Sequence, residues 1–149
     1  MGENWRLSRF YVVLLVIVVI GRWFVGNVRH LPYPIGTHIF SVVTFSLGAS
    51  LFYGAFCRRW RRFRIHQAAY LGLTLGLEAQ ILIVASTIIS YMLGIESYFN
   101  NPAALTRDAT GPIGFAAAMG YRAFGLVANL LLNAIAGALG WALGALLPE

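Results

Sequence analysis

The acidic residue Glu78 is the side chain of this sequence best placed to carry chemistry. It lies near the middle of a long apolar run, with Gln80 two residues later. An ionised carboxylate at the centre of a bilayer costs at least about 2.5–3.5 kcal/mol on insertion scales, so a partner or a function must offset that cost. Glu78 could therefore hold a proton or a cation, or it could hydrogen-bond a neighbouring helix.

The candidate partners of Glu78 lie in the last apolar segment. Asn129 and Asn133 are four residues apart and share one helix face, which continues to Gly137. Arg122 precedes them, but its guanidinium can snorkel outward, so a Glu78–Asn pair is easier to form than an ion pair. Glu78, Asn129, Asn133 and Arg122 thus form a predicted ion, proton or interhelical polar site, with plain hydrogen bonding between helices as the alternative.

Small residues in the last apolar segment predict close helix packing. Gly140 and Gly144 form a G-x-x-x-G pair, and Gly137 lies about one turn earlier. Removing side chains lets two helix backbones approach, and such packing drives helix association in lipid. The pair could serve packing within one chain or contact between two copies.

The second apolar segment has two faces that carry small and polar residues. At helical spacing, one face contains Ser41, Thr44, Gly48 and Ala55, and another contains Ser46, Ser50 and Gly54. Both faces suit close packing against other helices.

A basic cluster separates the second and third apolar segments. Its five members, within seven positions, are Arg58, Arg59, Arg61, Arg62 and Arg64. Such a cluster does not cross a membrane cheaply, and it binds anionic headgroups on the cytoplasmic side. Docking of a partner or a nucleotide is the alternative, although no phosphate-loop or dinucleotide fingerprint occurs in the sequence.

The remaining reactive side chains indicate no metal site, cofactor or catalytic centre. His38 and His66 are expected at opposite membrane faces, and His30 and His38 have no carboxylate or thiolate near them in the sequence. The single cysteine, Cys57, excludes an internal disulfide and a site of several cysteines. Two acidic residues share the loop after the third segment, but nothing orients them, so catalysis is the least favoured class of function.

Composition places these residues in a membrane protein. Of 149 residues, 59% are hydrophobic and 11% are charged, whereas soluble chains carry about 25% charged residues. The formal charge is +6, and all eleven basic residues are arginine. These arginines stand between or beside apolar segments, so we expect anionic lipid rather than nucleic acid as their partner.

Four apolar runs predict an all-α integral membrane protein of one domain with four transmembrane helices. About twenty apolar residues cross a hydrocarbon core roughly 30 Å thick, and the expected spans are about 10–28, 36–57, 67–93 and 118–146. A basic cytoplasmic loop at 57–66 and an external loop at 94–112, with an interfacial turn at Tyr98–Phe99, join them. The fourth span could start near Ile113 or near Phe124.

The first span and the arginine distribution complete the predicted arrangement. The first span has apolar residues on every side, so we expect it to face mostly lipid. Seven arginines lie on the side of the amino terminus and four on the other, which predicts that both termini are cytoplasmic. The amino-terminal run lacks a small-residue cleavage site and reads as an anchor of the bacterial cytoplasmic membrane rather than a removed signal.

Two functions fit this inventory. The first is a non-catalytic subunit or assembly partner of a larger membrane complex, which explains the small-residue faces and the lack of catalytic motifs. The alternative is a homo-oligomeric transporter or channel that uses Glu78 with Asn129 and Asn133. The sequence slightly favours the non-catalytic subunit, because a complete transport pathway would need more than one buried charge.

Overall fold

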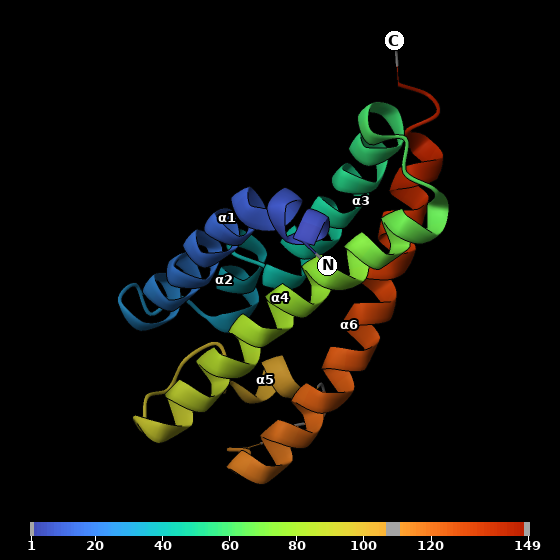
Figure 1. The fold of residues 1–149 in the computed structure, drawn as a ribbon. Helices are drawn as coiled ribbons and strands as arrows, with labels where there is room; N and C mark the ends of the chain where they lie inside the picture. The colour runs from blue at the N-terminus through green and yellow to red at the C-terminus, as the bar shows by residue number, and fades with distance from the viewer. Residues whose placement is uncertain (1, 107–110, 148–149) are drawn as a thin grey trace.

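A computed structural model describes residues 2–106 and 111–147, which form helices joined by short connections and contain no strand. The helices are α1 (Gly2–Asn27), α2 (Tyr33–Ile39), α3 (Val42–Arg61), α4 (Ile65–Met92), α5 (Pro102–Leu105) and α6 (Phe115–Leu143). Figure 1 shows α1 and α2 on one side of α4 and α6 on the other, with the short α5 between α4 and α6. Four segments are long and apolar enough to cross a membrane, as the sequence predicted: Leu7–Asn27, Ile35–Arg61, Ile65–Met92 and Phe115–Leu143.

Helices α3, α4 and α6 form the closely packed part of the bundle. Glycines bring their backbones together: a Cβ atom on Gly144 would lie 2.6 Å from the carbonyl oxygen of Ala55, and one on Gly140 would overlap the backbone of Leu51. Such close approach is the usual basis of helix association in lipid. Of the two uses that the sequence left open, Gly140 and Gly144 pack α6 against α3 within one chain.

Helix α1 buries one face against the bundle, which the sequence did not predict. The buried side chains follow helical spacing and are Ser8, Tyr11, Leu15, Val19, Arg22 and Val25. The opposite face remains exposed, so only one side of α1 is available to lipid, and its contact with lipid stays a prediction. In Figure 1 the N-terminal end of α1 lies beside the middle of α4.

The second span consists of two helices instead of one. The backbone leaves helical geometry at Phe40, with φ −125° and ψ 67°. Helix α3 then starts with Ser41 as its N-cap, whose Oγ accepts a hydrogen bond from the Thr44 amide at 3.3 Å. This cap satisfies an amide that the first helical turn leaves free. Hydropathy does not reveal the break, because the apolar run continues through it.

The basic connection is shorter than the predicted loop 57–66. Helix α3 continues through Arg61 and α4 begins at Ile65, so residues 62–64 alone join them. Arg62 ends α3 in the left-handed conformation with φ 55°, and its amide donates to the carbonyl oxygen of Cys57. Arginine is a good helix former, so α3 continues through the first three arginines of the cluster and ends only at Arg62.

The connection predicted at 94–112 is partly folded into the bundle. Tyr98 and Phe99, expected in an interfacial turn, are only 5% and 2% exposed. The fourth span, α6, begins at Phe115, close to the earlier of the two predicted starts. The positions of the termini relative to a membrane stay a prediction.

Candidate polar and apolar sites along the bundle

Glu78 is a residue of α4, and its side chain contacts the N-terminal end of α1. Its Oε1 accepts a hydrogen bond from Ser8 Oγ at 2.8 Å. Its Oε2 is buried and has no hydrogen-bond partner among the described residues. The nearby Tyr11 hydroxyl donates to the Leu75 carbonyl oxygen at 3.0 Å instead. Glu78 is therefore joined to the first helix, whereas the sequence predicted a partner from the last.

Asn133 is fully buried where α3, α4 and α6 meet. Its Oδ1 accepts from Ser50 Oγ at 2.7 Å, and its Nδ2 donates to the carbonyl oxygen of Asn129 at 2.8 Å and to Ser46 Oγ at 3.4 Å. Glycines of α4 make room for it, since a Cβ on Gly76 would lie 2.9 Å from Asn133 Cβ. Both polar atoms of this amide are used inside the bundle, which fits the interhelical hydrogen-bonding alternative.

Asn129 and Gly137 show how the predicted face of α6 is used. The Asn129 Nδ2 donates to the carbonyl oxygen of Gly125 in its own helix, at 2.8 Å. Gly137 is buried, and a Cβ there would lie 2.5 Å from the carbonyl oxygen of Ala68 in α4. The face therefore packs as predicted, but it contacts α3 and α4 without forming the expected pair with Glu78.

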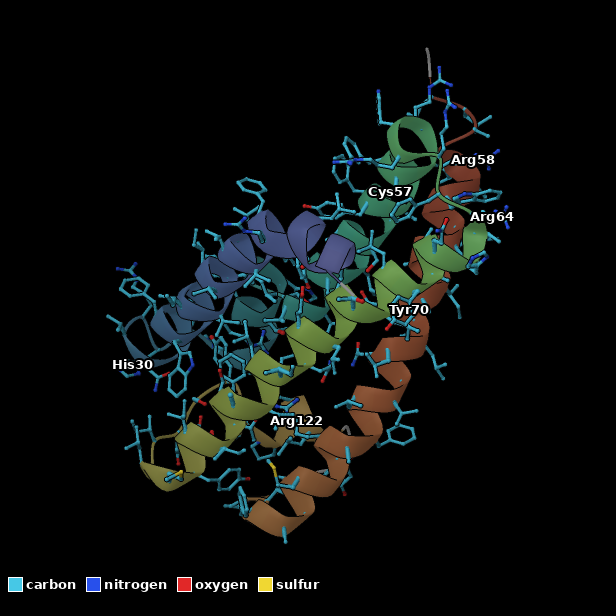
Figure 2. All side chains as sticks on the ribbon, in the orientation of Figure 1. His30, Cys57, Arg58, Arg64, Tyr70 and Arg122 are labelled. Carbon is cyan, nitrogen blue, oxygen red and sulfur yellow. The ribbon has the colours of Figure 1, made fainter. Side chains whose placement is uncertain are left out.

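Arg122 points inward, although the sequence predicted that it could snorkel outward. Its Nε donates to Thr87 Oγ1 of α4 at 3.1 Å, and its Nη2 donates to the carbonyl oxygen of Phe99 at 2.6 Å. Figure 2 places Arg122 beside α4 and α5. The four residues of the predicted polar site thus lie in three separate places: at α1, at the α3–α4–α6 junction and at the loop that follows α4.

Arg22 is a buried charge whose role the sequence did not indicate. It is 8% exposed, and its Nη1 donates to Thr37 Oγ1 at 3.1 Å and to the carbonyl oxygen of Phe40 at 3.0 Å. Its guanidinium carbon also lies 5.4–5.7 Å from the centroids of three aromatic rings, those of Tyr33, Tyr98 and Phe99. Cation–π contacts of this kind stabilise a partly desolvated arginine. The sequence did contain a signal for this buried arginine. Arg22 lies inside an apolar run, and aromatic residues occur between the first and second apolar segments and after the third.

The aromatic residue Tyr98 closes this region. Its hydroxyl donates to the Leu31 carbonyl oxygen, and its ring covers the backbone of Gly26 and Gly36. Burial raises the pKa of the Tyr98 hydroxyl, and the positive charge of Arg22 opposes that rise. At neutral pH the hydroxyl therefore stays protonated and keeps its donor role.

A small cavity of about 110 Å³ separates the two inward-facing arginines. Both Arg22 and Arg122 line it, together with Tyr33, Thr37 and Ser41. The rest of its wall comes from residues of α3, α4, α5 and the loop that follows α4. We call this region the two-arginine cavity.

A second and larger hollow, of about 550 Å³, lies between α1 and α3. Helix α1 contributes Phe10, Leu14 and Val18, and α3 contributes Phe45, Gly48, Phe52 and Tyr53. Ser41 and Thr44 also line it, so three of the four residues of one small-residue face of α3 lie here, whereas the fourth, Ala55, packs against Gly144 at the end of α6. We call this hollow the α1–α3 groove.

The Arg58–Arg64 cluster divides into an inward and an outward part. Arg58 stacks on Trp141 of α6 at 3.9 Å and donates to its carbonyl oxygen at 3.1 Å. The Trp141 Nε1 in turn donates to the Phe63 carbonyl oxygen at 2.6 Å. Arg61, Arg62 and Arg64 are exposed, while Arg59 is half-buried. Arg58 therefore ties α3 to α6, and contact with anionic lipid stays a prediction for the others.

The histidines are spread over the molecule. His30 lies at one end of the bundle and Arg64, two residues before His66, at the other (Figure 2). His38 is exposed on α2. Among residues 2–106 and 111–147, no three side chains of histidine, cysteine, aspartate or glutamate lie together as a metal site would require.

No protein-family model matches this chain, and comparisons with curated proteins and with solved structures gave no match either.

Proposed function

We propose that the protein is a non-catalytic subunit of a larger membrane complex and that it binds a transmembrane helix of a partner in the α1–α3 groove. The observation that carries this proposal is the use of the two small-residue faces of α3. The face with Ser46, Ser50 and Gly54 is buried inside the chain. The face with Ser41, Thr44 and Gly48 lines the groove, which the chain itself does not fill.

The chemistry of the groove favours a helix over lipid chains. Small and polar residues on a membrane-facing surface let helix backbones approach and hydrogen-bond, and lipid tails gain nothing from them. Gly48 illustrates this, because a Cβ added there would meet no atom within 4 Å. Aromatic side chains, among them Phe45 and Phe52, form the walls beside it. A partner helix would meet small residues, with no side chain at Gly48, between broad apolar walls.

The test compares two glycines that tolerate a side chain equally well within the chain. Gly48→Leu fills the groove, whereas Gly120→Leu on α6 adds the same side chain at an exposed position with no atom within 4 Å. The tagged protein would be isolated from native membranes in mild detergent, and its co-purifying proteins quantified by mass spectrometry. We expect a stoichiometric partner with wild type and Gly120→Leu and its loss with Gly48→Leu. Purification alone, or equal recovery with both variants, contradicts the proposal.

A second candidate is the homo-oligomeric transporter or channel that uses Glu78. The observation that favours it is the buried Oε2 atom, which lacks a hydrogen-bond partner among the described residues. Such an atom is free to bind a proton or a cation, as intramembrane carboxylates of transporters do. In liposomes, Glu78→Gln should then abolish proton-driven uptake or conductance, and Glu96→Gln, an exposed carboxylate, should not. Unchanged activity in Glu78→Gln removes this candidate.

A further inference from the structure

The two-arginine cavity collects hydrogen-bond donors from several elements. Arg22 comes from α1, Arg122 from α6, and the hydroxyl groups of Tyr33, Thr37 and Ser41 from α2 and the start of α3. Its volume of about 110 Å³ is well above the roughly 15 Å³ that a single water needs. The cavity is therefore roomy enough for a small polar ligand.

The charges around the cavity are unbalanced within the described residues. The hydrogen-bond acceptors found for the two guanidinium groups are hydroxyl and carbonyl oxygens, which carry no formal charge. No carboxylate of the described residues lines the cavity, since Glu78 lies at Ser8 and Glu96 is exposed. Two like charges facing one space of low dielectric repel each other, and buried unpaired charges are costly. An anion in the cavity would remove both penalties.

The donor set indicates which anion fits. A guanidinium is a planar fork that matches the oxygen atoms of phosphate in pairs, and hydrogen bonds to an ionised acceptor are the strong ones. Arg122 uses Nε and Nη2 for the protein, and its Nη1 has no hydrogen-bond partner among the described residues. Hydroxyl groups such as those of Tyr33 and Thr37 can donate to further oxygens of the same ligand.

The depth of the cavity suits a headgroup. Arg22 lies five residues before the end of the first apolar span, and Arg122 seven residues after the start of the fourth. At a rise of 1.5 Å per residue, these positions are about 8–11 Å inside the ends of the spans. A phosphate reaches this depth either as part of an anionic lipid or as a free ion from the water phase.

We propose that the two-arginine cavity binds a phosphoryl oxyanion between Arg22 and Arg122. The arginines at this end are thus a binding site, distinct from the lipid-facing cluster at the Arg58–Arg64 end and independent of the partner helix proposed for the α1–α3 groove. The ligand is defined by its chemistry, and its two sources, lipid headgroup and free phosphate, are separated by the test below.

The first measurement uses the full wild-type chain. In a neutral detergent, thermal unfolding is followed during titration with sodium phosphate, and the same ionic strength is supplied by sodium chloride as control. In parallel, native mass spectrometry compares nanodiscs of phosphatidylglycerol with nanodiscs of phosphatidylcholine. A saturable stabilisation by phosphate indicates the free ion, and retained phosphatidylglycerol with no response to phosphate indicates the lipid. No saturable response to either, or an equal response to chloride, overturns the proposal.

Matched variants then locate the site. Arg22→Gln should weaken binding about tenfold or more, because it removes a charge-assisted hydrogen bond. Arg29→Gln removes an exposed arginine near the same end and should leave binding unchanged. Because Arg22→Gln could fail to fold, Ala104→Leu provides a second variant: it fills the cavity and keeps both arginines, whereas Ala103→Leu adds the same side chain at an exposed position. Equal binding by Ala104→Leu and Ala103→Leu overturns the assignment.

One residue outside the described part of the chain requires its own variant. Asp108 follows the α5 helix by three positions, and Ala104 of that helix lines the cavity. If Asp108→Asn binds phosphate and wild type does not, the chain neutralises its own arginines and the proposal is wrong. If wild type binds and Asp108→Asn changes the affinity less than Arg22→Gln does, the site stands.

Discussion

The two sides of α4 are built differently. On the α6 side, glycines bring backbones into contact, and Asn133, buried at the α3–α4–α6 junction, has both of its amide atoms bonded. On the α1 side, the contacts are made by large side chains, such as Tyr11 stacked on Phe45 at 5.6 Å and Trp23 against Phe99 at 5.6 Å. Both the α1–α3 groove and the two-arginine cavity are lined by residues of α1.

This contrast indicates that the α6 side of α4 supports the fold and that the α1 side offers the space for binding. Where glycines bring the backbones of α3, α4 and α6 into contact, no space is left for a ligand, so this part holds the shape of the bundle. The α1–α3 groove and the two-arginine cavity both lie where α1 meets its neighbours through larger side chains. The buried side-chain atoms without a hydrogen-bond partner among the described residues, Asn27 Oδ1 and Glu78 Oε2, also lie on the α1 side, and Arg22 of α1 lines the two-arginine cavity together with Arg122 of α6. We therefore expect mutations on the α6 side to change stability and those on the α1 side to change binding.

The largest expected effect is that of Gly140→Leu. A side chain there would overlap the backbone of Leu51, so α3 and α6 would have to separate. Overpacking of a tight core costs about 1–3 kcal/mol, and contact with backbone places this change at the upper end or prevents folding. Thermal unfolding in detergent, with Gly120→Leu as control, measures it. Equal stability of the two variants would mean that the glycine contact does not hold the bundle.

A smaller effect is expected for Asn133→Ala. The change removes hydrogen bonds to Ser50, Ser46 and the backbone of Asn129, each worth on average about 0.6 kcal/mol in membranes. The expected loss is about 1–2 kcal/mol, measured by the same unfolding assay. Asn129→Ala, which loses one bond within its own helix, should cost less. The reverse order would contradict the central position assigned to Asn133.

The smallest effect is expected on the α1 side, for Tyr11→Phe. This change removes the hydrogen bond to the Leu75 carbonyl oxygen and keeps the ring stacked on Phe45. The expected cost is about 0.6 kcal/mol. A loss as large as that of Asn133→Ala would show that α1 supports the bundle as strongly as α6 does, and the contrast between the two sides would fail.

The sequence predicted the long helices and the packing face of α6 because composition and glycine spacing determine both. It could not reveal the buried face of α1. In water, burial selects apolar side chains, but in a membrane both faces are apolar, and only the spacing of Ser8, Tyr11 and Arg22 distinguishes them. The break at Phe40–Ser41 was hidden for the same reason, since the apolar run continues through it.

The predicted polar site was partly wrong in its pairings. Glu78 and Asn133 were singled out by their cost in a membrane, and both prove to be hydrogen-bonded between helices. Their partners are serines, which carry little signal of their own. Ser8 also lies before the predicted first span, so its expected depth in the membrane did not match that of Glu78. Matching polar residues by expected depth therefore paired Glu78 with the last helix instead of the first. Arg22 is one of the four arginines predicted on the side away from the amino terminus, and the arginine count does not indicate that it is buried.

The contact between Ser8 and Glu78 joins residues 70 positions apart, and it constrains how the chain is made. At about 5–20 residues per second, the ribosome adds Glu78 to the chain several seconds after it adds Ser8. Arg22 meets Thr37 and Phe40 within 18 residues, so its hydrogen bonds become available early. The hydrogen bonds of Arg22 can thus form early in synthesis, whereas the amino-terminal half of α1 can dock only after α4 has been synthesised.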